Sequence, residues 1–340
     1  MSPAEDQPLV TVSIVVPVYA GAEFLVRLAE AVGELRAQWE AQGAPLRLNE
    51  FILVDDASAD GSADIIDKLA REHPWIVALH LSRNFGQHAA TMAGVLHSSG
   101  DWVVTMDEDL QHPPASVPDL LRAAVAQRAD IVYSNPLGGV HESALRDFTS
   151  RSFKRLMHWL TGNPRLIHVN SFRLIRGPIG RAAASVSAHD TYFDVCLSWF
   201  SQRVEIVRMT LKDERYIRSG KSGYTFRLLL SHAWRMLFSS QIRLLRLGPM
   251  IGFAVMMLSL LGILYFVGLK LIFPEQIEVR GWTSQFLATC FFGGLSVFML
   301  GLALQYISTL VLKAHGKPTF FTVDRSVDEV VARWFEDMTS

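Results

Sequence analysis

The sequence contains 340 residues, a length that allows a complete α/β domain and a further segment beyond it. Its hydrophobic content of 50% and its mean hydropathy of +0.22 are high for a soluble enzyme. The net charge of −1 gives no sign of the strongly basic face typical of nucleic-acid-binding proteins, so we expect no nucleic-acid partner. The two cysteines, Cys196 and Cys290, provide neither a disulfide framework nor the spacing of a metal site.

The first part of the chain alternates short β-branched runs with helical patterns. The runs VTVSIVVPVY, EFILVDDAS, IVALHLS, DWVVTMDED and ADIVYS predict strands, and a helix from about Ala22 to Gln42 is the first of the predicted helices between them. Continuous apolar strands that are each followed by a helix indicate a parallel sheet covered on both faces. We therefore predict a doubly wound α/β domain with a mostly parallel sheet.

Polar residues follow four of the predicted strands at the points where those strands end. They are Pro17 and Tyr19, Asp55 and Asp56, Arg83 and Asn84, and the acidic triplet Asp107 to Asp109. Ligands of doubly wound sheets bind outside the carboxyl ends of the strands. The sequence therefore predicts a site at this edge of the sheet, and the acidic triplet is better explained by that site than by a solvated turn.

The acidic triplet contains two aspartates, Asp107 and Asp109, in a D-x-D spacing. Leaving a strand on the same side, they can share one hard cation through oxygen ligands, and such a metal would offset both their repulsion and the charge of a diphosphate leaving group. The first strand is not followed by G-x-G-x-x-G, and the chain has no P-loop motif, which argues against hydride transfer and P-loop hydrolysis. The pattern favours a metal-bound nucleotide diphosphate as leaving group.

The pattern changes after Tyr133. The segments that follow are a basic amphipathic helix in ALRDFTSRSFKRLMHWLTG, a strand and helix in SFRLIRGPIGRAAAS, a helix in HDTYFDVCLSWFSQ, a strand in RVEIVRMTL and a basic loop in KDERYIRSGKSGY. In TFRLLLSHAWRMLFSSQIRLLR, large apolar side chains are interleaved with arginines, which favours a helix lying in a membrane interface. A soluble amphipathic helix is the alternative.

Two stretches without any charged residue follow, at 247–269 and 281–312. Each exceeds the roughly 20 residues that cross a bilayer core, so we predict transmembrane helices, with a pair of buried core helices as the alternative. Lys and Arg residues flank the pair on both outer sides, which places both ends of the hairpin in the cytosol. The start MSPAEDQPLVTVS lacks the basic and apolar parts of a signal peptide, so we expect the preceding domain to stay cytosolic.

These boundaries divide the chain into five parts. We predict a cytosolic catalytic domain at 1–223, an interfacial amphipathic region at 224–246, transmembrane helices at 247–273 and 281–312, and a cytosolic tail at 313–340. The expected protein is therefore a multi-pass membrane protein with both termini in the cytosol.

Four motifs in chain order resemble those of a known family: SIVVPVYA, FILVDDASADGS, LSRNFGQHAATMAG and MDEDLQHPP. They are similar to the motifs of family 2 glycosyltransferases, in the branch that contains dolichyl-phosphate mannose synthase and bacterial polyprenyl-phosphate sugar transferases. GKSGYTFRLL, the two apolar stretches and GKPTFFTVDRS extend the resemblance toward the bacterial two-span undecaprenyl-phosphate (aminoarabinose-type) transferases. The resemblance implies a GT-A fold, a nucleotide-diphosphate sugar donor, Mg²⁺ or Mn²⁺, inversion at the anomeric carbon, a polyprenyl phosphate acceptor and the bacterial inner membrane.

The resemblance also implies roles for the donor-side residues. The nucleotide should be held by Pro17, Tyr19, Glu23, Asp55 and Asp56, the metal and diphosphate by Asp107 and Asp109, and the sugar or acceptor should lie near Gln111. Glu23 has an alternative role as an acid that begins a helix, where it would suit the helix dipole. The family favours UDP over GDP, and spacing alone does not distinguish the sugar.

On the acceptor side, the resemblance implies two groups of basic and hydroxyl residues. The lipid phosphate should be bound by Arg146, Ser150 and Arg151, and a loop carrying Arg215, Arg218, Lys221 and Ser222 should close over the diphosphate. A solvated basic helix face is the alternative for the first group. Asp190 should orient the acceptor, because the phosphate nucleophile arrives ionised and needs no strong base. The segment IHVNSFRL departs from the family in lacking the common D-x-G before F-R-L.

Two other functions remain open at this point. A processive polysaccharide synthase would normally carry a Q-x-x-R-W motif and more spans, and here the tryptophan that follows an arginine late in the chain lies in VARWF, past the second span. A catalytically inactive nucleotide-sugar-binding membrane component would not need Asp107, Asp109 and Gln111. We therefore predict a polyprenyl-phosphate glycosyltransferase, and we expect it to be a homo-oligomer.

Overall fold

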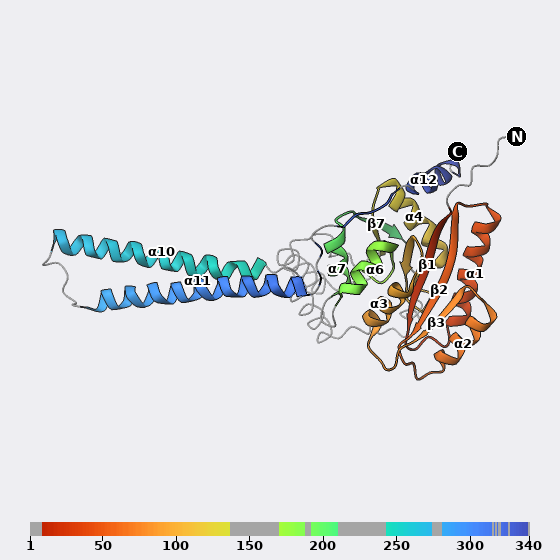
Figure 1. Ribbon diagram of the computed structural model, residues 1–340, viewed down its shortest axis with the longest axis horizontal. Helices are drawn as coiled ribbons and strands as arrows, with labels where there is room; N and C mark the ends of the chain where they lie inside the picture. The colour runs from red at the N-terminus through yellow and green to blue at the C-terminus, as the bar shows by residue number, and fades with distance from the viewer. Residues whose placement is uncertain are drawn as a thin grey trace, which may run out of the picture. The chain divides into compact units, whose positions relative to one another are not determined.

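The computed structural model describes residues 9–136, 170–187, 192–209, 243–273 and 281–314, together with 316, 318, 321–325 and 327–338. These residues belong to two compact units. The first unit holds the described residues up to 209 and those from 318 onward, and the second holds the described residues between 243 and 316. Each unit is described by itself (Figure 1).

The described residues of the first unit form a seven-stranded sheet in the order β3-β2-β1-β4-β6-β5-β7. The strands are β1 (Val10–Val18), β2 (Leu46–Asp55), β3 (Ile76–His80), β4 (Trp102–Thr105), β5 (Ile131–Pro136), β6 (Arg173–Arg176) and β7 (Val204–Met209). From β1 the chain adds β2 and β3 on one side and then β4 on the other side. The strand order therefore reverses between β1 and β4, which is the place where doubly wound sheets bind ligands.

Most strand pairs are parallel, as the sequence predicts. β1 runs parallel to β2 and β4, β2 to β3, and β5 to β7. β6 is antiparallel to both of its neighbours, β4 and β5. The sequence does not reveal the direction of that strand, because an apolar run reads the same whichever way the strand enters the sheet. The fold is a GT-A-like mixed sheet with helices on both faces.

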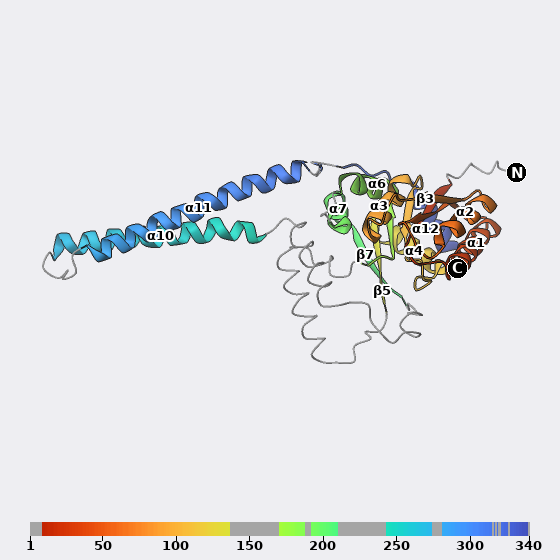
Figure 2. The ribbon, with the colours of Figure 1, turned by 90° about the horizontal axis from the view of Figure 1, so that it is seen from below.

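Side chains that alternate along β1 enter two different cores. Ile14 belongs to a core that includes residues of α1 (Leu25–Ala41), α2 (Ser62–Glu72), α4 (Val117–Ala126) and α12 (Asp328–Asp337). Val15 belongs to a core that includes residues of α3 (Gln87–His97), α6 (Gly177–Val186) and α7 (Phe193–Phe200). A short 3₁₀ helix, η1 (Pro114–Ser116), precedes α4. Figures 1 and 2 show these helices on the two faces of the sheet. This covering explains why the strands are almost continuously apolar.

The first helix begins later than the sequence predicts. α1 starts at Leu25 and not at about Ala22, because the amides of Phe24 and Leu25 both donate to the carbonyl of Gly21 and close a turn before the helix. Residues 21–24 therefore stay in the loop that follows β1, beside the predicted site.

The C-terminal segment is part of the first unit, although its sequence predicts a separate tail. Val331 and Phe335 of α12 are 0% and 4% exposed and lie in the same core as α4. Arg176 donates to Asp130 at 3.1 Å and to both oxygens of Asp328 at 2.9 and 2.7 Å. Arg325 donates to the same oxygen of Asp130 at 2.6 Å. We call these four charged residues the arginine clamp.

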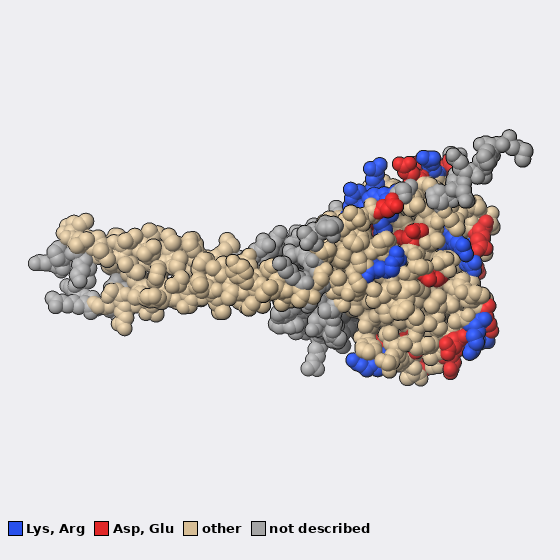
Figure 3. Space-filling model, in the orientation of Figure 1, with Lys and Arg blue, Asp and Glu red and all other residues tan. Residues whose placement is uncertain are grey.

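The second unit consists of two long helices, α10 (Arg243–Ile272) and α11 (Trp282–Ala314). Their apolar windows, Pro249–Leu269 and Ser284–Val311, have mean hydropathies of 2.4 and 2.0 and are 11% buried. On the face seen in Figure 3, their described side chains carry no charge. Apolar surfaces that are so exposed suit lipid contact and disfavour the alternative of buried core helices.

Glycines allow α10 and α11 to pack closely. A Cβ atom on Gly252 would lie 2.4 Å from the backbone nitrogen of Phe298, and one on Gly294 would lie 2.7 Å from that of Met256. Small residues at such contacts are typical of helix packing in membranes, where dispersion contacts replace the hydrophobic effect between helices.

Candidate active site

A cleft of about 310 Å³ lies at the carboxyl ends of β1 and β4, where the strand order reverses. It is lined by Pro17, Val18, Tyr19, Asp56, Asn84, Gly86, Gln87, Asp107, Glu108 and Asp109. The lining comes from the ends of four strands, so the structure brings together the polar strand ends that the sequence singles out.

Asp107 is held from two sides. Its Oδ1 accepts a hydrogen bond from the Gln87 side-chain amide at 2.6 Å, and its Oδ2 accepts one from the Ser171 hydroxyl at 2.7 Å. Gln87 begins α3, and Ser171 comes just before β6. The orientation of this carboxylate is therefore fixed by elements on either side of β4. Ser171 lies in the segment where the sequence departs from the family pattern.

His112 supports the acidic turn. Its side chain is 8% exposed, stacks on Phe172 at 4.9 Å between ring centroids, and accepts the backbone N–H of Asp107 through Nδ1 at 3.3 Å. Burial lowers the pKa of His112, although the nearby charges of Asp107 and Asp109 act in the opposite direction. The neutral ring with its proton on Nε2 matches this bonding pattern.

Asp109 is 5% exposed and is oriented by the residue that follows the turn. The backbone N–H of Gln111 donates to Oδ1 at 3.2 Å, and its side-chain amide donates to Oδ2 at 2.9 Å. Leu110 between them has a φ of 62°, a left-handed conformation that is uncommon for a branched side chain. Gln111 itself is not among the residues that line the cleft.

Glu108, the middle acid of the triplet, turns toward the loop after β1. Its carboxylate accepts the backbone N–H groups of Tyr19 at 2.9 Å and Ala20 at 3.4 Å. Each of the three consecutive acids therefore accepts hydrogen bonds from different donors, and their carboxylates are directed toward different neighbours.

The two aspartates after β2 differ in position. Asp56 lines the cleft, and its two oxygens accept the backbone N–H groups of Phe85 at 2.7 Å and Gly86 at 2.8 Å. Asp55 is 4% exposed and is not among the lining residues. Its Oδ1 accepts the N–H of Ser58 at 2.9 Å. Asp56 thus fixes the loop before α3, and Asp55 is buried outside the lining of the cleft.

His80 lies between two carboxylates at the end of β3. Its Nδ1 is 3.2 Å from Asp55 and its Nε2 is 3.1 Å from Asp67. Burial acts to lower the pKa of His80, but hydrogen bonds and charge interactions with Asp55 and Asp67 outweigh it, so the pKa is raised. Only the protonated ring can donate to both carboxylates at once.

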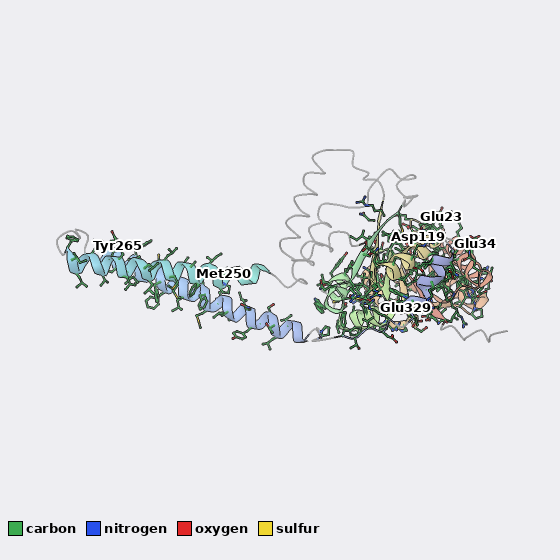
Figure 4. The ribbon with its side chains drawn as sticks, turned by 90° about the horizontal axis from the view of Figure 1, so that it is seen from above. Glu23, Glu34, Asp119, Met250, Tyr265 and Glu329 are labelled. Atoms are coloured by element: carbon green, nitrogen blue, oxygen red, sulfur yellow. The ribbon has the colours of Figure 1, made fainter. Side chains whose placement is uncertain are left out.

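Glu23 is exposed in the turn before α1 and is not among the lining residues (Figure 4). It precedes the first turn of the helix, so the structure places it neither in the cleft nor in the helix. The remaining predicted site residues lie outside the described residues: Arg146, Ser150, Arg151, Asp190, Arg215, Arg218, Lys221 and Ser222.

Three lining residues were not singled out from the sequence, Val18, Gly86 and Gln87, and two that were, Asn84 and Glu108, were given no role. Asn84, Gly86 and Gln87 lie together in RNFGQH, and Gly86 has φ 91° and ψ 157°, a conformation that strongly favours glycine. A glycine between a strand end and a helix was the available signal, because it marks a place where the backbone turns sharply beside a ligand site.

The cleft is acidic. Asp56, Asp107, Glu108 and Asp109 line it, and none of its ten described lining residues is Lys or Arg. The described residues contain no group of three His, Cys, Asp or Glu that could hold a metal by themselves. Mg²⁺ is usually held by one or two carboxylates together with substrate phosphates, and Mn²⁺ accepts the same oxygen ligands. The oxygen-only donor pair of Asp107 and Asp109 fits such an ion.

Residues 13–193 match the model of the family described as Glycosyl transferase family 2. A protein of Klebsiella pneumoniae is 30% identical over 317 residues, which cover 92% of this chain and 93% of that protein. One of Pectobacterium carotovorum is 29% identical over 316 residues, which cover 91% and 92%. Both relatives are named undecaprenyl-phosphate 4-deoxy-4-formamido-L-arabinose transferase.

Among solved structures, glucosyl-3-phosphoglycerate synthase from Mycobacterium tuberculosis in complex with phosphoglyceric acid is similar at 17% identity and a TM-score of 0.45. The similarity covers 68% of this chain and 81% of that one. It is too distant to assign a substrate.

Proposed function

The chain belongs to glycosyl transferase family 2, and from this membership we propose that it transfers a sugar from a nucleotide-diphosphate sugar to undecaprenyl phosphate. The proposed reaction takes place at the cytosolic face of the bacterial inner membrane and inverts the configuration at the anomeric carbon. The observation that carries the proposal is the acidic cleft at the switch point, combined with relatives that match more than nine-tenths of the chain, the apolar helices included.

The donor nucleotide is proposed to lie along the ends of β1 and β2. Tyr19 supports this placement because its side chain lines the cleft and is 54% exposed, so its ring is available to a base. Pro17 and Asp56 line the same wall. Asp55 and Glu23 do not line the cleft, and their place in the nucleotide set follows from the family resemblance, as does the preference for UDP.

Asp107 and Asp109 are proposed to hold Mg²⁺ or Mn²⁺, and the ion, when bound, neutralises charge on the diphosphate leaving group. The residues around them prepare this arrangement. Gln87 and Ser171 orient Asp107, and Gln111 orients Asp109. Two carboxylates at the edge of one cleft are the oxygen ligands that Mg²⁺ and Mn²⁺ accept together with a diphosphate, which supports the metal requirement.

The acceptor phosphate attacks the anomeric carbon as its ionised form, since a phosphate monoester has a second pKa of about 6. Alignment and leaving-group stabilisation are then the main tasks of the protein. Arg146, Ser150 and Arg151 are proposed to bind this phosphate, Asp190 to orient it, and the loop with Arg215, Arg218, Lys221 and Ser222 to close over the diphosphate. These assignments remain predictions from the resemblance.

The membrane arrangement is proposed to be a hairpin with both of its ends in the cytosol. The chain leaves the first unit before α10 and returns to it after α11, because residues 318–340 belong to that unit. This return of the chain supports a hairpin whose two ends lie on the same side of the membrane, as in a multi-pass protein with cytosolic termini. Reporter fusions near Met1 and after Ser340 test this: both should be active in the cytosol, and a periplasmic signal at either end contradicts the hairpin.

The activity is tested with purified full-length protein in lipid nanodiscs, undecaprenyl phosphate, Mg²⁺ or Mn²⁺ and a panel of labelled UDP- and GDP-sugars. We expect one donor to give a product that is extractable into organic solvent, with release of the nucleoside diphosphate. A water-soluble polymer would instead identify a processive synthase, and binding without turnover would identify an inactive component. Asp109→Asn protein is the matched control for background hydrolysis of the donor.

A further inference from the structure

We propose that Glu108 is a positioning residue that ties the loop after β1, residues 19–22, to the turn after β4, residues 107–111. We call the first segment the nucleotide loop and the second the metal-binding turn. This inference rests on the proposed function and deepens it. Glu108 lies between the two proposed metal ligands in sequence, yet its carboxylate accepts the backbone N–H groups of Tyr19 and Ala20, at 2.9 and 3.4 Å. These two hydrogen bonds join residues that are 89 and 88 positions apart in the sequence.

The nucleotide loop approaches Glu108 as closely as a glycine allows. A Cβ atom on Gly21 would lie 2.8 Å from Oε2, 3.1 Å from Cδ and 3.3 Å from Cβ of Glu108. Gly21 is not among the residues with positive φ, so an alanine there would be opposed mainly by the Glu108 carboxylate, which would have to move. The two loops are therefore packed against each other as well as hydrogen-bonded.

The other amides of this loop have partners elsewhere. The N–H of Gly21 donates to the Ser62 hydroxyl at 3.2 Å, and that of Ala22 donates to Asp60 at 3.0 Å. Those two contacts hold the loop against the N-terminal end of α2. Glu108 supplies the hydrogen bonds that join it to the turn after β4, and so it sets the distance between the nucleoside and the diphosphate parts of the site.

This role predicts a separation in kinetic effects. Loss of the Glu108 carboxylate should release Tyr19 from its position and weaken binding of the nucleotide, while Asp107 and Asp109 keep their own partners and their affinity for the metal. A hydrogen bond to a charged group contributes enough to change an equilibrium by roughly ten- to a hundred-fold. Because Tyr19 is exposed, we expect the lower end, about tenfold, in the KM for the donor and the Kd for the nucleoside diphosphate.

The alternative role is that Glu108 acts by its charge, as a third ligand or a repulsive group beside the metal. Glu108→Gln separates the two, since glutamine keeps an acceptor oxygen for the N–H of Tyr19 and loses the charge. In a positioning role, the Glu108→Gln protein should retain nucleotide binding within about threefold of wild type, and Glu108→Ala should not. In a charge role, the two variants should be equally impaired, and both should change the metal concentration needed for half-maximal rate.

The experiment compares wild type, Glu108→Ala, Glu108→Gln and Gly21→Ala as full-length protein in nanodiscs. It measures the Kd for UDP and GDP by calorimetry, the donor KM and kcat, the half-saturating Mg²⁺ concentration and the thermal midpoint. Gly21→Ala should displace the carboxylate and resemble Glu108→Ala, and the double variant should be no weaker than Glu108→Ala by more than about twofold. Glu34→Ala, an exposed glutamate on α1, is the matched control (Figure 4).

Weaker nucleotide binding in Glu108→Ala and Gly21→Ala, restored in Glu108→Gln at an unchanged metal requirement, supports the positioning role. Equal impairment of the Glu108→Ala and Glu108→Gln proteins with a shifted metal requirement overturns it, and so does wild-type binding in Glu108→Ala. If Glu108→Ala does not fold, Glu108→Gln and Gly21→Ala still decide between these outcomes. Failure of wild-type protein to transfer any sugar would overturn the proposed function instead, while the nucleotide Kd values would still test Glu108.

Discussion

Two clusters of carboxylates in this protein have different kinds of partners, arginines in one cluster and amides and a hydroxyl in the other. In the arginine clamp, Asp130 and Asp328 are paired with Arg176 and Arg325, and all the charges are balanced within the chain. In the cleft, the acids accept hydrogen bonds from backbone amides, a serine and glutamines, so the directions of their oxygens are fixed. The ion pairs of the clamp hold the end of the chain to the sheet, whereas the hydrogen bonds of the cleft hold carboxylates at the edge where doubly wound sheets bind ligands.

The largest effect is expected from breaking the clamp. Arg176→Met should remove both hydrogen bonds to the Asp328 carboxylate and leave Asp130 with Arg325, and breaking such a buried pair costs about 3 kcal/mol of unfolding free energy. Chemical denaturation of the full-length protein should show this loss. The nucleotide Kd of the folded fraction should stay unchanged. The matched control is Arg333→Met, whose pair with Glu329 is 76% and 79% exposed and should contribute little.

The cleft should respond in the opposite way to Asp109→Asn. Asparagine keeps the shape of the side chain and can still accept the N–H of Gln111, so the thermal midpoint should change by only a few degrees. Transfer should fall by on the order of 100-fold or more, because a metal ligand is lost. The initial rate of nucleoside diphosphate release measures this change. A rate within a few-fold of wild type would remove Asp109 from the metal site.

A smaller effect is expected from loosening the support of Asp107. Ser171→Ala removes the hydroxyl that donates to Oδ2, and loss of such a supporting bond should raise the half-saturating Mg²⁺ concentration by about tenfold. Ser198→Ala is the matched control, since that hydroxyl donates to a carbonyl of its own helix, that of Val195. An unchanged metal requirement in Ser171→Ala, at wild-type stability, would show that Gln87 alone orients the carboxylate.

The smallest effect concerns His80, which lies between two carboxylates beside the cleft. Because its folded-state pKa is raised above the ordinary value of 6.5, protonated His80 adds stability below that pH, and this stability is lost as pH rises through the folded-state pKa. The ring is 38% exposed, so the contribution should be at most about 1 kcal/mol. Unfolding free energies of wild type and His80→Leu should therefore differ more at pH 5.5 than at pH 8.5. A larger difference at pH 8.5 would reverse the sign.

Much of the fold follows from local pattern. The alternation of apolar runs and helical segments predicts the doubly wound sheet, and the strand ends of β1, β2 and β4 predict where the cleft forms. The direction of β6 and the position of α12 cannot be predicted from the sequence pattern. An apolar run does not indicate the direction of a strand, and an amphipathic helix does not indicate which surface it covers.

The residues predicted for the site lie at the cleft where their position depends on local pattern. Pro17, Tyr19, Asp56, Asp107 and Asp109 line the cleft, and each lies at or shortly after the end of a strand that the sequence marks clearly. Asp55 and Gln111 lie beside the lining and act on their neighbours. Gln87 and Glu108 were given no role from the sequence, since an amide or an acid next to a motif gives no indication of which way its side chain turns.

The sequence by itself determined the α/β class, the edge of the sheet that carries the acids and the two apolar helices, because each depends on residues that are neighbours along the chain. The tertiary structure alone decided the partners of those acids. Glu108 meets Tyr19 across 89 positions, Asp107 meets Ser171 across 64, and Arg176 meets Asp328 across 152. Such pairs depend on strand order and register, which become fixed only when the strands assemble into one sheet.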